Sequence, residues 1–166
     1  MKNISLKYFL AATTIFFLFN SKGLIAQDYK GWEDVKPLRN NHNKNVREHI
    51  SAMHDEYKSR NKLDLKKLNS HAAAIREETE KIKNYTSEMQ SRFNSKEKTT
   101  GKTLRKIVYA YNEILVNEMK IETELKTKQP NINQLDKLGL RINLILDKTE
   151  ILWRKLEAKI TYDIKH

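Results

Sequence analysis

The feature that most constrains this chain is the stretch 65–93, where apolar or small residues recur at alternating steps of three and four. Such steps keep every member of the set on one face of an α-helix. The residues between them are nearly all charged or amide, so the apolar stripe is narrow. A narrow stripe favours packing of helix against helix over a thick globular core. Its members are Leu65, Leu68, Ala72, Ile75, Thr79, Ile82, Thr86, Met89 and Phe93.

The start of the chain has the three-part layout of a secretory signal peptide. Two lysines precede the apolar run 9–19, and small residues follow it. An apolar run of this length is too short to cross about 30 Å of hydrocarbon as a helix. We therefore expect residues 1–26 to be a signal peptide cleaved after Ala26, with Gly23 as the second choice. The protein would then be exported, to the periplasm or the medium; an uncleaved membrane anchor is the alternative.

Composition bounds the mature chain further. Removing the three lysines of the signal peptide from the 32 basic residues leaves 29 against 21 acidic ones, a net charge of +8. The chain has no cysteine, which excludes disulfides, thiolate catalysis and covalent c-type haem attachment. Only two prolines and four glycines occur among 166 residues. This scarcity of turn-forming residues indicates long helices joined by few turns.

We predict an all-α fold for residues 27–166, as a single domain. Four helices would form an antiparallel up-down-up-down four-helix bundle of coiled-coil character, because short connections favour antiparallel neighbours. Residues 27–34 would be a short lead before the first helix, with Pro37 in its first turn. The expected helices span approximately 34–60, 64–94, 102–128 and 133–163.

Local signals place the breaks between these helices. The step from Tyr57 to the first leucine of the stripe is eight residues where a heptad needs seven. We expect a turn there with Asp64 as the next N-cap, and one long helix running through a stutter is the alternative. Residues 95–101 have the composition of a loop. Pro130 stops the third helix, and Asn133 is the expected N-cap of the fourth.

The fourth helix carries more apolar residues than one face needs. We expect it to be the most buried element, or else to present a face for self-association. Its segment 138–144 alternates with period two, as a half-buried strand does, but no second such stretch offers a pairing partner. Helix is therefore the prediction. The additional apolar residues are Leu140, Leu144, Leu146, Ile151 and Trp153.

The sharpest local motif is Thr100-Gly101-Lys102-Thr103, which resembles the end of a phosphate-binding loop. The full motif needs a glycine five positions before Gly101 and a preceding strand, and neither is present, so we exclude nucleotide hydrolysis. A helix N-terminus that presents free N–H groups among several bases could still bind an anion. A solvated lysine-rich loop is the simpler interpretation. The candidate anion-binding residues are Lys96, Lys98, Gly101, Lys102, Arg105 and Lys106.

A second basic cluster is expected at the opposite end of the bundle. Positive charge at both ends fits a polyanion, such as an anionic lipid surface or polysaccharide. Nucleic acid is disfavoured as a partner, because the protein is exported and no aromatic residues interleave the bases. The cluster comprises Lys58, Arg60, Lys62, Lys66, Lys67, Lys126 and Lys128.

No residue pattern indicates a metal site, a cofactor or catalysis. His42 and His49 would stand about 10.5 Å apart along a helix, too far to share one metal ion, and we expect the histidines to lie on the surface. No serine-nucleophile motif and no pair of carboxylates in apolar surroundings is apparent. Trp153, Tyr109 and Tyr111 would line a ligand slot between helices or, more simply, belong to the core.

These observations favour an exported, non-enzymatic helical bundle that acts by binding a protein partner, itself or an anionic envelope surface. In outline the chain resembles exported coiled-coil accessory proteins of envelope machines such as conjugation or secretion systems. That resemblance is one of architecture, carried by no motif, so no residue roles transfer. It makes an accessory subunit of such a machine the first alternative. A small-ligand sensor or carrier bundle is the second.

Overall fold

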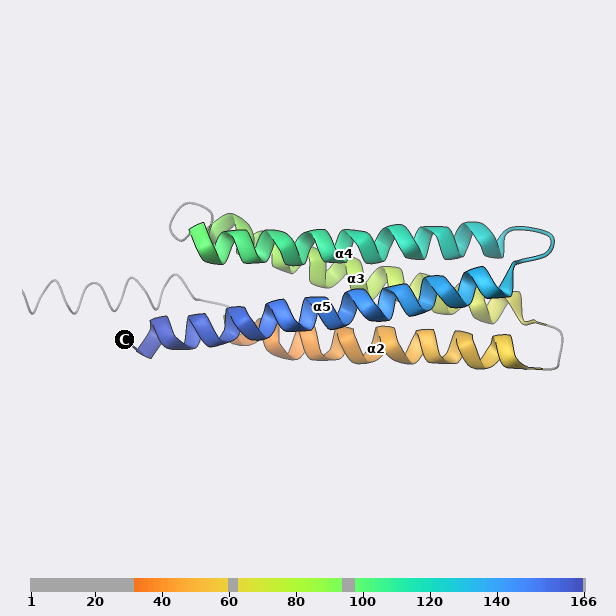
Figure 1. Ribbon diagram of the computed structural model, residues 1–166, viewed down its shortest axis with the longest axis horizontal. Helices are drawn as coiled ribbons and strands as arrows, with labels where there is room; N and C mark the ends of the chain where they lie inside the picture. The colour runs from red at the N-terminus through yellow and green to blue at the C-terminus, as the bar shows by residue number, and fades with distance from the viewer. Residues whose placement is uncertain (1–31, 60–62, 94–97, 166) are drawn as a thin grey trace, which may run out of the picture.

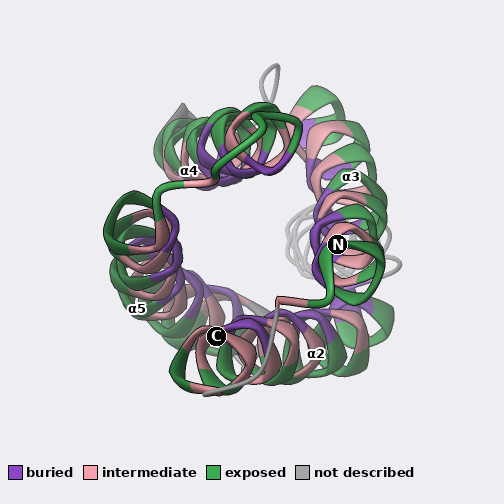
Figure 2. Cartoon of the chain, turned by 90° about the vertical axis from the view of Figure 1, so that its right-hand side faces the viewer, coloured by how far each residue is buried: buried purple, intermediate pink, exposed green. Residues whose placement is uncertain are grey.

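The described residues form a bundle of four long helices. The computed structural model describes residues 32–59, 63–93 and 98–165, and these contain no strand. Consecutive helices run in opposite directions and are joined at their ends (Figure 1). Seen along the bundle, they form a ring in which each helix turns its buried side inward (Figure 2). The helices are α2 (Trp32–Lys58), α3 (Leu65–Phe93), α4 (Lys98–Leu125) and α5 (Ile132–Lys165).

The buried face of α3 is the stripe that the sequence predicts, with one exception. Eight of its members are buried, and their steps of three and four run unbroken from Leu68 to Phe93. Leu65 is 37% exposed, so its assignment to the core is wrong. It is the first residue of α3 and lies at the end of the bundle, where its side chain is covered less than those of the residues that follow.

α4 carries two overlapping sets of apolar residues, and only one of them is fully buried. Ile107, Tyr111 and Ile114 point fully inward, whereas Val108 and Leu115 are only half-buried at the margin. Both sets satisfy a spacing of three and four, so the pattern alone does not separate them. The buried set includes Tyr111, one of the largest fully buried side chains of the core.

α5 is apolar on two sides. Leu146 and Trp153 are buried in the core, whereas Leu140, Leu144 and Ile151 are each more than half exposed. The segment with period two is helical, as predicted. The helix also approaches α2 closely: a Cβ added at Gly139 would lie 3.2 Å from Ile50 Cγ2.

α2 begins earlier than expected. Trp32 is its first residue and is buried, with its ring centroid 6.0 Å from that of Trp153. The predicted lead 27–34 is therefore partly helix, because burial of the indole stabilises the extra turn. Pro37 consequently lies inside the helix and not in its first turn. Glu33 and Asp34 occupy the first turn, where the helix dipole favours acids.

Two helix starts have capping contacts. Asp64 caps α3 as predicted, since its Oδ1 accepts a hydrogen bond from Lys67 N at 3.0 Å. At α5 the predicted cap, Asn133, is wrong. Asn131 is the N-cap, because its Oδ1 accepts from Gln134 N at 3.1 Å, and Asn133 lies within the helix.

α4 differs most from its predicted span of 102–128. It begins at Lys98, because Thr100 continues the core stripe one turn before Leu104 and is fully buried. It ends at Leu125, where the chain closes into a turn. There the Glu124 carboxylate accepts a hydrogen bond from Asn131 N at 2.7 Å.

The predicted signal peptide, residues 1–26 with cleavage after Ala26, lies outside the described residues. None of the described helices combines the length and the hydropathy that crossing a bilayer requires.

Candidate functional site

The predicted anion-binding residues lie in and beside the first turns of α4. Lys96 falls outside the described residues, Lys98 opens the helix, and Gly101 is buried within it. The remaining three, Lys102, Arg105 and Lys106, are exposed, and none forms an ion pair with a described residue. No acid lies in the first turn of α4. This start of a helix is therefore basic where the dipole favours acids.

The described members of the second basic cluster lie at the other end of the bundle, where α2 and α4 end and α3 begins (Figure 1). Arg60 and Lys62 are outside the described residues. Lys67 is neutralised in part, because its Nζ lies 3.2 Å from Glu56 Oε2. The other described lysines of this cluster are exposed and form no ion pair with a described residue; they are Lys58, Lys66, Lys126 and Lys128.

The expectation of surface histidines is wrong for His42, which is 1% exposed at a core position of α2. Its Nε2 lies 3.3 Å from Thr79 Oγ1 on α3. The Thr79 hydroxyl donates its own proton to the Ile75 carbonyl at 2.7 Å, and the other ring nitrogen, Nδ1, lies 3.1 Å from Asn43 Oδ1. A neutral ring carries one N–H and so donates to only one of these two oxygens. Burial lowers the pKa of His42 to about 4, which keeps the ring neutral at physiological pH.

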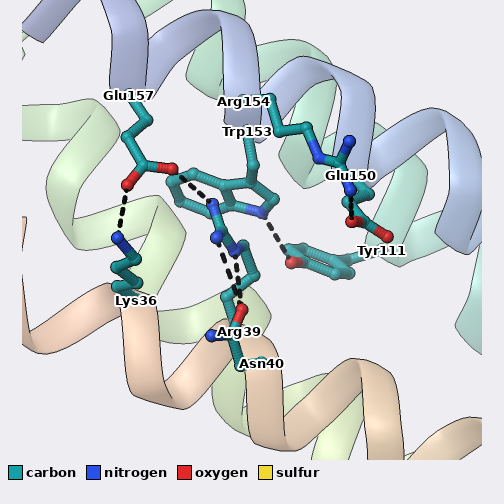
Figure 3. Close-up of polar contacts among 8 residues, drawn as sticks. All are labelled: Lys36, Arg39, Asn40, Tyr111, Glu150, Trp153, Arg154 and Glu157. Atoms are coloured by element: carbon teal, nitrogen blue, oxygen red, sulfur yellow. Dashed lines mark hydrogen bonds and ion pairs between the residues drawn. The ribbon is translucent and has the colours of Figure 1, made fainter.

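A row of aromatic side chains continues from His42 across the core. Its ring meets Tyr111 of α4 edge-on, with centroids 5.2 Å apart. The Tyr111 hydroxyl accepts a hydrogen bond from Trp153 Nε1 of α5 at 2.9 Å (Figure 3). Tyr111 and Trp153 are thus core residues that satisfy one another, whereas Tyr109 is 66% exposed. The predicted slot lined by all three is not formed.

A buried arginine lies beside this row of aromatic side chains. Arg39 of α2 is buried, and its Nη1 lies 3.5 Å from Glu157 Oε2 of α5 (Figure 3). Lys36 Nζ lies 2.8 Å from the other oxygen of Glu157. The hydrogen bond from Lys36, with the two positive charges, lowers the pKa of Glu157 below its usual range. The network ties α2 to α5.

A carboxylate pair that the sequence pattern does not reveal lies between α3 and α4. Glu118 is fully buried, and Arg76 reaches both of its oxygens, Nε at 3.1 Å and Nη2 at 3.3 Å. Arg76 also forms an ion pair with Glu122. Burial raises the pKa of Glu118 to about 7, and its hydrogen bond with Glu122 raises it as well. Burial alone would raise the pKa of Glu122, but hydrogen bonds from Arg76 and Glu118 lower it.

The bundle has a groove between α2 and α3, with a volume of about 260 Å³. Asn41 and Asn45 line it from α2, and Glu78, Lys81 and Tyr85 line it from α3. Its apolar and ring surface comes from Leu38, Ile82 and His42.

Comparison with protein-family models, curated proteins and solved structures finds no match.

A histidine pair lies nearer the α2–α3 turn. The Nδ1 atoms of His49 and His71 are 3.0 Å apart, and His71 Nε2 is buried without a hydrogen-bond partner. Burial and the neighbouring His49 lower the pKa of His71. His54 Nδ1 lies 2.6 Å from Asp136 Oδ1. Within the described ranges, no group of three or more histidine, cysteine, aspartate or glutamate side chains is arranged to hold a metal ion.

Proposed function

We propose that this is an exported, non-enzymatic helical-bundle protein that acts by binding an anionic surface of the cell envelope. The observation that carries the proposal is the basic start of α4. There Lys102, Arg105 and Lys106 are exposed and form no ion pair with a described residue. Unpaired cations on a rigid helix can meet phosphate or carboxylate groups without first breaking internal contacts. The net charge of +8 expected for the mature chain draws it towards such a surface.

The test is binding of the mature protein to vesicles with anionic lipid, to neutral vesicles and to an anionic polysaccharide. We expect binding to the anionic probes at low salt and steep release as salt rises. Comparison of lipid with polysaccharide identifies the source of the anion. The triple variant K102E/R105E/K106E should lose the binding and keep its helicity, because acids suit a helix N-terminus better than bases do.

The matched control reverses Lys66, Lys126 and Lys128, which are exposed at the other end of the bundle. It changes the net charge by the same amount, so a smaller loss of binding places the site on α4. Equal losses would show that net charge alone acts and that α4 is not special. Unchanged binding in both variants would contradict the proposal.

A protein partner is the second candidate, favoured by the exposed apolar side chains Leu140, Leu144 and Ile151 on the outer side of α5. Self-association or membership of an envelope machine would use the same surface. Co-purification in a large membrane-associated complex that L140E/L144E disperses would favour this candidate over direct surface binding.

A further inference from the structure

The groove between α2 and α3 is lined by apolar and polar side chains from both helices. Leu38 and Ile82 supply the apolar contacts, and the neutral ring of His42 borders them. Asn41 and Asn45 stand one turn apart on α2, so their carboxamides face the same space. A volume of about 260 Å³ is smaller than most pockets for drug-sized molecules, which indicates a small ligand.

Opposite charges line the α3 side of this groove without neutralising each other. Glu78 and Lys81 form no ion pair together, and Lys81 has no ion pair with any described residue. One oxygen of Glu78 accepts a hydrogen bond from Asn45 Nδ2 at 3.3 Å, which holds the carboxylate at the wall. The carboxamide of Asn41 has no hydrogen-bond partner among the described residues. The carboxylate of Glu78, the ammonium group of Lys81 and the carboxamide of Asn41 thus line the same small groove.

We infer that this groove binds a small zwitterion of the α-amino-acid type. The ligand carboxylate would pair with Lys81 and the carboxamide of Asn41, and its ammonium group with Glu78. An apolar side chain would lie on Leu38 and Ile82. Glu78, Lys81 and Asn41 then each gain a partner of opposite character, while Asn45 keeps its hydrogen bond to Glu78. Charge-assisted hydrogen bonds provide the orientation. This inference goes beyond the surface binding proposed above and does not depend on it.

The test uses the mature protein and four probes, followed by calorimetry and by amide chemical shifts of the groove residues. L-leucine carries both charges and an apolar side chain. 3-Methylbutylamine lacks the carboxylate, 4-methylpentanoate lacks the ammonium group, and mannitol is a neutral polyol. We expect L-leucine to bind and to shift groove resonances, and each truncated probe to bind at least about tenfold more weakly, since each loses a charged hydrogen bond.

Matched variants decide whether the groove is responsible. K81Q and E78Q should each weaken L-leucine binding at least about tenfold, while K83Q and E80Q, on the same helix outside the groove, should leave it unchanged. Circular dichroism checks that all four variants keep their helicity. Equal binding of all four probes, or no saturable L-leucine binding at millimolar concentration, would overturn the inference. Preference for mannitol would also overturn it, because a polyol needs neither charge.

Discussion

At the scale of single residues, the ionisable groups buried in the core have opposite effects on stability. His42 stays neutral in the fold, because burial lowers its pKa from 6.5 to about 4. Glu118 holds its proton in the fold, because burial raises its pKa from 4.5 to about 7. Between these values the unfolded chain binds more protons than the fold at His42 and fewer at Glu118. Linkage therefore gives the two residues opposite dependences on pH.

We predict that H42Q flattens the loss of stability on acidification. The contribution of His42 is complete above about pH 6.5 and is lost as pH falls towards 4, a difference of about 3 kcal/mol at most. Free energies of unfolding in urea, measured from pH 7 to 4, would reveal the change of slope. A curve parallel to that of the wild type would show that His42 titrates alike in both states.

The companion variant E118Q should change the slope in the other direction. The contribution of Glu118 is complete below about pH 4.5 and is lost as pH rises through about 7. In the wild type it therefore offsets part of the acid loss due to His42, and its removal should steepen that loss. The same urea series provides the measurement. A flatter curve for E118Q would mean that Arg76 keeps Glu118 ionised throughout.

At the scale of helices, the sequence predicts which positions face inward better than it predicts what they meet. The stripe of α3 follows from geometry alone, so Ile75 and Ile82 are found where expected. Composition misleads at the start of α4, where a threonine and a glycine suggest a loop but Thr100 is buried as a core residue. Pairings between helices are not encoded locally. Nothing near Arg76 indicates that Glu118 lies opposite, and the groove likewise needs two helices side by side.

A pair of identical substitutions tests the inward face. Ile82 is 2% exposed and Ile151 is 54% exposed. I82D should cost about 4 kcal/mol or more, because it buries a charge without a partner, and that is a large share of the ~5–15 kcal/mol typical of a domain. I151D should cost less than about 1 kcal/mol. Urea unfolding of both variants gives the comparison, and equal costs would contradict the assignment of faces.

At the scale of the whole molecule, one apolar core runs through all four described helices, from Trp32 in α2 to Ile160 in α5. The chain has no cysteine, so no disulfide links these helices. Packing and buried polar pairs alone hold the four helices together. Folding of such a chain needs no oxidant, which suits the export that we propose above.

We predict that the exported protein begins at Gln27. Sequencing of the N-terminus of material recovered from outside the cytoplasm tests this directly. A chain that begins at Gln27 should also unfold at the same urea concentration as one that retains residues 1–26, because a signal peptide is removed from the mature protein and is not part of its fold. An intact Met1 in the membrane fraction would instead identify the segment as an anchor.

The buried polar residues have a consequence for how the helices align. A stripe that repeats every seven residues looks nearly the same to its neighbours after a slide of one heptad, about 10.5 Å. Such a slide of α4 along α3 would carry Glu118 away from Arg76 and leave a buried carboxyl group without the hydrogen bonds that Arg76 donates, at a cost of about 1–3 kcal/mol. A slide between α2 and α3 would likewise part His42 from Thr79. Apolar packing makes the helices associate, and these two contacts select one register among several.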